Sequence, residues 1–91
     1  MKIVINKCFG GFGLSDFALE KLTKNEWYYE DNRTDAELIG ILGQYPTEKI
    51  NGRFAELEIV ELPENCTDYY IDEYDGLETL IYVVNGKLHF A

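Results

Sequence analysis

The sequence predicts an α+β fold: a small, mostly antiparallel sheet with a C-terminal three-stranded meander and two packed α-helices. Three observations favour this fold. The chain opens with a strand-like alternation, two capped amphipathic stretches follow near residues 16–24 and 35–44, and two hairpin dipeptides, Asp75-Gly76 and Asn85-Gly86, divide the C-terminal part. The 91 residues suit a single compact domain spanning residues 1–91.

The N-terminal part predicts a strand, a turn and a helix. In Met1–Cys8, Ile3 and Ile5 share one face of a buried strand, which the glycines that follow interrupt. Ser15 is a good N-cap for a helix over Asp16–Lys24. The apolar stripe of that helix is formed by Leu14, Phe17, Ala18 and Leu22.

The middle of the chain predicts a second helix. The segment Glu26–Arg33, with Trp27, Tyr28 and Tyr29, fits either a short strand or a packed loop. Thr34 and Glu37 have the spacing of a capping box, in which Thr34 caps the helix and Glu37 reaches back. The buried face is expected to be Leu38, Ile39, Leu42 and Tyr45, and Gly43 and Pro46 are expected to end the helix.

From Phe54 on, the chain is expected to be rich in β-strands. Ala55, Leu57 and Ile59 alternate with glutamates in a strand that Pro63 closes. The hairpin dipeptides then join strands over Tyr69–Tyr74, Leu77–Val84 and Lys87–Phe90. This register places three pairs opposite one another: Ile71 with Leu80, Val83 with Leu88, and Glu73 with Glu78.

The charge distribution limits the partners. Residues 1–53 carry 8 acidic and 7 basic side chains, whereas residues 54–91 carry 9 acidic side chains and one basic side chain, Lys87. A net charge of −9 repels phosphate backbones, so we expect no nucleic-acid binding. If the protein binds a basic partner, the second half is the candidate surface.

Other patterns indicate a cytoplasmic protein without a membrane segment. No apolar run approaches the roughly 20 residues of a membrane span, and the N-terminus lacks the pattern of a signal peptide. Cys8 and Cys66 are too few for a disulfide framework and are expected to be reduced thiols.

The glycine-rich turn is the first candidate site. Gly10, Gly11, Phe12 and Gly13 lie between a strand and a helix that begins after Ser15, and Lys7 precedes them. Such a turn lets a ligand approach the backbone, and a helix N-terminus suits a phosphate or carboxylate. The spacing matches neither a Walker loop nor a dinucleotide fingerprint. The alternative is a tight turn whose glycines serve geometry alone.

Arg33 is the second candidate. Its guanidinium can bind a phosphate or carboxylate with two hydrogen bonds, or it can form an ion pair with the neighbouring Glu30, Asp31 or Asp35. Stacking on a nucleotide base would fall to Trp27, Tyr28 or Tyr74.

The third candidate is the acidic hairpin 72–78. Opposed Glu73 and Glu78 are unfavourable without a cation or a basic partner, although a solvated acidic face is the simplest interpretation. Catalysis is poorly supported, since nothing orients His89 toward Cys8. We interpret Cys8 as a core residue and His89 as a sheet-surface residue, and we expect no metal site and no cofactor.

The opening 1–15, MKIVINKCFGGFGLS, resembles a family of small bacteriophage and prophage proteins. Arg33-Thr34-Asp35 and Glu73-Tyr74-Asp75-Gly76 also resemble that family's pattern, so the similarity touches the beginning, middle and end of the chain. The resemblance implies a phage context, in which small proteins often act against host defence. Some sequester nucleotide signals, some block a protein directly and some imitate DNA.

Three functions follow as hypotheses. The first is a non-catalytic phage-type accessory protein that binds a small anionic, nucleotide-derived ligand through Lys7, the 10–15 turn and Arg33. The second is a protein-interaction inhibitor whose acidic, DNA-mimic-like surface binds a basic host protein, and the third is a small enzyme. The surplus of aromatic residues in a small domain also predicts a homodimer or a higher homo-oligomer.

Overall fold

The structure is a computed structural model, and it describes residues 1–22 and 33–91. Three helices and five strands follow in the order β1 (Lys2–Asn6), α1 (Asp16–Lys21), α2 (Ala36–Gln44), α3 (Thr47–Ile50), β2 (Leu57–Glu61), β3 (Cys66–Tyr74), β4 (Leu77–Val84) and β5 (Lys87–Phe90). The α+β class and the C-terminal antiparallel meander are confirmed. The strand or loop expected around Trp27–Tyr29 lies outside the described residues.

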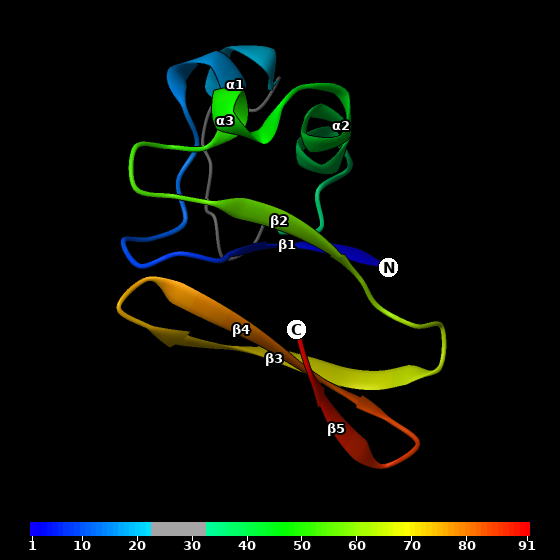
Figure 1. Ribbon diagram of the computed structural model, residues 1–91. Coiled ribbons are helices and arrows are strands. Elements are labelled where there is room, and N and C mark those ends of the chain that lie inside the picture. Colours follow the sequence, from blue (N-terminus) through cyan, green and yellow to red (C-terminus); the bar gives the residue numbers. More distant parts are fainter. Residues whose placement is uncertain (23–32) are drawn as a thin grey trace.

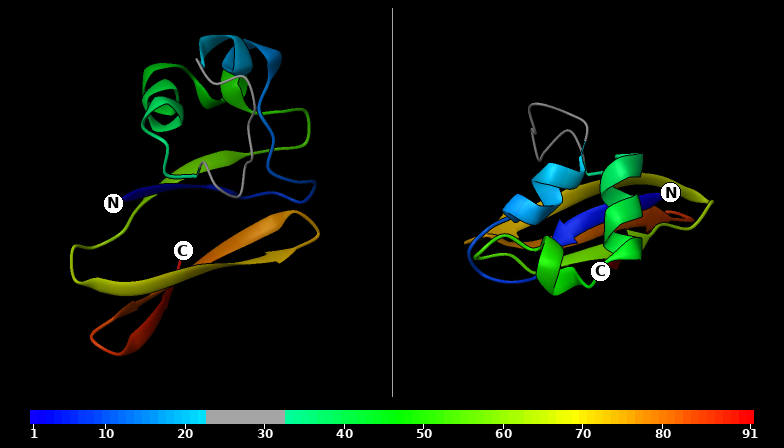
Figure 2. Two further views of the ribbon diagram at one scale, coloured as in Figure 1. Left: turned by 180° about the vertical axis from the view of Figure 1, so that it is seen from behind. Right: turned by 90° about the horizontal axis from the view of Figure 1, so that it is seen from above.

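The strands form two antiparallel sheets. β1 pairs with β2, and the meander has the strand order β3-β4-β5. The helices lie on one side of the β1–β2 pair, whereas the meander lies on the other (Figure 1). The same layers are visible from behind, and the view from above shows the helices lying over the strands (Figure 2). β1 is therefore the central strand of a molecule with three layers.

Residues on the two faces of β1 belong to two hydrophobic clusters. Val4 packs with the helix residues Ala18, Leu38 and Ile50, whereas Ile3 and Ile5 pack in a cluster with Leu62 and Leu80 of the meander side. The predicted shared face of Ile3 and Ile5 is confirmed. Because both faces of β1 are covered, every residue from Ile3 to Asn6 is buried.

The predicted hairpin register is confirmed. Ile71 lies opposite Leu80, Glu73 opposite Glu78, and Val83 opposite Leu88. Both dipeptide turns adopt positive φ at both positions, 51° and 89° at Asp75-Gly76 and 53° and 75° at Asn85-Gly86. These values are typical of the type I′ turns that suit the twist of two-residue hairpins.

The structure corrects the predicted cap of the second helix. Asp35, not Thr34, is the N-cap: its carboxylate accepts hydrogen bonds from the backbone N–H groups of Glu37 (3.0 Å) and Leu38 (3.2 Å). A carboxylate satisfies two N–H groups and also interacts favourably with the helix dipole, so it is the stronger cap.

Several predicted boundaries shift as well. The first helix ends at Lys21 rather than Lys24, and Gly43 lies inside α2 rather than at its end. β3 begins at Cys66 rather than Tyr69, and Ala55 precedes β2 in a turn. None of the helices in the described part of the chain is long and apolar enough to cross a bilayer.

Candidate functional site

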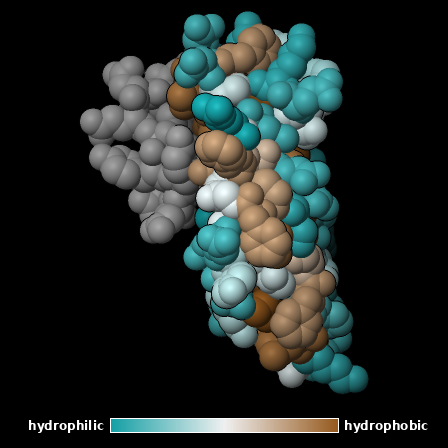
Figure 3. Space-filling view, turned by 60° about the vertical axis from the view of Figure 1, so that its left-hand side comes forward, coloured by the Kyte–Doolittle hydropathy of each residue, from teal (hydrophilic) through white to brown (hydrophobic). Residues whose placement is uncertain are grey.

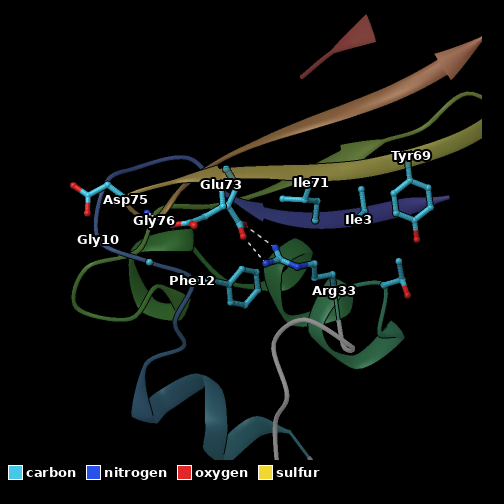
Figure 4. Close-up of a pocket in the computed structure, with 12 residues that line it drawn as sticks. Ile3, Gly10, Phe12, Arg33, Tyr69, Ile71, Glu73, Asp75 and Gly76 are labelled. Carbon is cyan, nitrogen blue, oxygen red and sulfur yellow. Dashed lines mark hydrogen bonds and ion pairs between the residues drawn. The ribbon is translucent and has the colours of Figure 1, made fainter. Parts of the chain in front are cut away.

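An open cavity of about 740 Å³ lies between the glycine turn, Arg33–Thr34 and the β3–β4 hairpin. The side chains of Tyr69, Ile71 and Glu73 point from β3 toward Ile3 and Arg33 (Figure 4). The residues that line it are Ile3, Gly10, Gly11, Phe12, Arg33, Thr34, Tyr69, Ile71, Glu73, Asp75, Gly76 and Glu78. The cavity thus brings together parts of all three candidate sites.

The glycine turn packs directly on the hairpin turn. Gly10 and Gly11 have φ of 131° and 146°, a region that side chains rarely adopt. The N–H of Gly10 donates to the carbonyl of Asp75 at 3.0 Å, and a Cβ on Gly76 would lie under 3.0 Å from backbone atoms of Gly10 and Gly11. Gly76 has a structural role here, because its lack of a side chain allows the two backbones to touch at one end of the cavity.

The helix after the turn does not face the cavity with free N–H groups. Ser15 caps α1, where its hydroxyl accepts from Ala18 N–H at 3.1 Å and donates to the carbonyl of Lys49. Ser15, Gly13 and Lys7 do not line the cavity. Of the residues predicted to hold an anion, the structure therefore brings only Gly10, Gly11, Phe12 and Arg33 together.

Arg33 is held by Glu78. One guanidinium nitrogen donates to Glu78 Oε1 at 2.7 Å and to the carbonyl of Val4 at 3.2 Å, and the other pairs with Glu78 Oε2. Only 11% of the Arg33 side chain and 5% of the Glu78 side chain are exposed. The Arg33 Cζ atom lies 4.7 Å from the centroid of the Phe12 ring. Among the described residues Arg33 thus pairs with the distant Glu78, whereas Glu30 and Asp31, two of the acids expected from the sequence, lie outside the described residues.

Arg33 also offsets the repulsion expected between Glu78 and Glu73. The two lie opposite each other as predicted, and Arg33 supplies the positive charge that such a pair requires. Glu73 bends back to accept from the N–H of Gly76. Glu73 and Asp75 are exposed, and neither forms an ion pair with another described residue.

Asn6 connects the layers, a role that the sequence analysis did not identify. It is fully buried, and its backbone N–H donates to Glu78 Oε1 at 2.7 Å. Its side-chain amide donates to the carbonyls of Cys8 (2.9 Å) and Gly76 (2.7 Å), and its oxygen accepts from Glu56 N–H (2.7 Å). The sequence did carry a signal for this role: Asn6 is a lone amide side chain in an apolar strand, and a buried amide needs hydrogen-bond partners.

The aromatic residues near the cavity differ from those expected. Phe12 and Tyr69 line it, whereas Tyr74 does not and is 76% exposed. Successive strand residues face opposite sides, so Tyr74 points away from the side of Glu73, and its ring contacts Phe9 edge-on at 6.4 Å. Trp27 and Tyr28 lie outside the described residues.

The described cysteines and the histidine form no catalytic arrangement. Cys8, expected in the core, is only half-buried and lies 3.4 Å from the carbonyl of Phe54. His89 is exposed on β5 and stacks on Tyr82 at 5.3 Å. Cys8 and Cys66 are both free thiols. No group of three His, Cys, Asp or Glu side chains in residues 1–22 and 33–91 could hold a metal ion.

The charges at the cavity favour a cationic group. Arg33 contributes one positive charge, and Glu73, Asp75 and Glu78 contribute three negative charges, so the described lining carries −2. Since Glu78 already neutralises Arg33, the excess lies on the exposed Glu73 and Asp75. Comparison of the chain with known protein families, curated proteins and solved structures finds no match.

Proposed function

We propose that this chain is a non-catalytic, phage-type accessory protein that binds a basic segment of a host protein in the host cytoplasm. The observation that carries the proposal is the pair of exposed carboxylates, Glu73 and Asp75, beside an open cavity with apolar and aromatic walls. An arginine or lysine side chain combines an apolar stem with a charged head, so it suits such a site.

The walls of the cavity fit this partner. Ile71 and Tyr69 offer apolar contact to the stem, while Glu73 and Asp75 offer hydrogen-bond acceptors to the head. The surrounding half of the chain, residues 54–91, has a net charge of −8, which favours encounter with a positive surface.

A direct test is titration with a capped peptide of sequence Arg-Thr-Val-Thr-Val-Thr-Arg, followed by NMR of the backbone amides. We expect shifts at Tyr69, Ile71 and Glu73, and no binding of the same peptide with glutamate in place of both arginines. If the two peptides bind equally, or neither binds, the proposal fails.

A small anionic, nucleotide-derived ligand remains a second candidate. It is favoured by the contact of Arg33 with Phe12 in the same cavity, since an anion could replace Glu78 on the guanidinium and a base could stack on a ring. Thermal-shift screening of nucleotides and cyclic nucleotides distinguishes the candidates. Stabilisation by a phosphate-bearing ligand that Arg33→Ala abolishes would favour this second function.

A further inference from the structure

One edge of the meander is open beside the cavity. β3 pairs only with β4 in the described part of the chain, so its other side presents unpaired backbone groups. An exposed strand edge is a template for another strand, which pairs through main-chain hydrogen bonds.

The hairpin turn determines which backbone groups face this edge. In a two-residue type I′ hairpin, the flanking residues, here Tyr74 and Leu77, form a hydrogen-bonded pair. Hydrogen-bonded and non-hydrogen-bonded pairs alternate from there, so Glu73, Ile71 and Tyr69 belong to non-hydrogen-bonded pairs. Their N–H and C=O groups point away from β4.

Hydrogen bonds elsewhere support this assignment. Leu80, which lies opposite Ile71, directs both its N–H and its C=O to Ala91 on the far side of β4. The N–H of Tyr69 donates to its neighbour Asp68 Oδ1 at 2.9 Å rather than to β4. The edge groups of Ile71 and Glu73 are thus available to a partner.

The same three residues line the cavity. Tyr69, Ile71 and Glu73 direct their side chains into it (Figure 4). Their backbone groups, by the register of the hairpin, point to the open edge. A strand laid along this edge would place alternate side chains over the cavity face, where one basic side chain meets Glu73 and Asp75.

We infer that the basic segment binds as an added β-strand along Tyr69–Glu73 of β3, with alternate side chains over the cavity. This inference rests on the proposed function and specifies its binding mode. The charge of the edge favours one kind of occupant. Asp72 and Glu73 lie in the edge and Asp68 and Asp75 lie close to its ends, so an acidic copy of this chain is a poorer fit than a basic segment.

The test uses the same capped peptide in two forms that carry methyl groups on backbone nitrogens. One form is methylated at both valines, and the other is methylated at all three threonines. In an added strand only one alternating set of N–H groups faces β3, so one form should bind at least tenfold more weakly, while the other should bind like the parent. Amide exchange of Ile71 and Glu73 should slow at least tenfold on binding, with Asp72, already paired with Thr79, unchanged.

The outcomes are separable. If the parent peptide binds but both methylated forms bind equally well, the strand mode is overturned while the proposed function stands. If the parent does not bind at all, the proposed function itself fails. If Ile71 and Glu73 become protected when the protein alone is concentrated, the occupant is a second copy, and the inference of a basic partner is overturned.

Discussion

The Arg33 guanidinium and the Glu78 carboxylate, 45 positions apart in the chain, form a bidentate ion pair in the wall of the open cavity. The pair joins the segment before α2 to the second strand of the meander. Glu78 also accepts from the backbone of Asn6 in β1, so one carboxylate connects three parts of the fold.

Removing one member of this pair should destabilise the protein. Arg33→Ala leaves a buried Glu78 without its counter-charge, and we expect a loss of about 3 kcal/mol in the free energy of unfolding, measured with urea. The double variant Arg33→Met with Glu78→Gln should recover most of that loss, because it removes both buried charges and keeps an acceptor for the N–H of Asn6. A loss under about 0.5 kcal/mol for Arg33→Ala would show that the pair does not stabilise the fold.

The two hairpin glycines should differ in their tolerance of a side chain. Gly76→Ala forces a Cβ against the backbone of Gly10 and Gly11, whereas Gly86, with φ of 75°, has nothing within 4 Å of an added Cβ. We expect Gly86→Ala to cost about 1 kcal/mol, the penalty of the left-handed conformation alone, and Gly76→Ala to cost clearly more. Thermal unfolding of the two variants measures the difference, and equal losses would contradict the contact between the turns.

Self-association is predicted through the outer face of the meander. Tyr70, Ile81 and Phe90 lie side by side across its three strands, and Tyr70 and Phe90 are 49% and 67% exposed. Figure 3 shows hydrophobic residues in a broken band along one face of the molecule. We expect a homodimer by sedimentation at micromolar concentration, strengthened by salt because salt screens the net charge of −9.

A matched pair of variants tests that face. Phe90→Ser should weaken the dimer, while Phe54→Ser, which removes a ring that is 66% exposed and outside the meander, should not. A monomer under all salt conditions would contradict the prediction.

Much of the fold could be predicted because its signals are local. Asp75-Gly76 and Asn85-Gly86 determine the meander register, and alternation predicts the face shared by Ile3 and Ile5. The pairing of β1 with β2 could not be predicted, because it joins Ile3 to Val60 across the helices. α3 was missed because four residues give too little periodicity.

The candidate site was predicted only in part. Gly10, Gly11, Phe12 and Arg33 do line one cavity, but pairing of Arg33 with the distant Glu78 depends on the tertiary fold. Tyr69 was missed because strand alternation alone does not say which face of β3 borders a cavity.

The most direct test of the proposed function compares two double variants in titrations with the arginine-bearing peptide. Glu73→Gln with Asp75→Asn removes the two unpaired charges at the cavity, whereas Glu58→Gln with Glu61→Gln removes two exposed charges from β2. We predict that the first pair weakens binding roughly three- to tenfold at low salt, that the second has little effect, and that the difference shrinks as salt is added. Equal binding by both double variants would contradict recognition of a basic segment at this cavity.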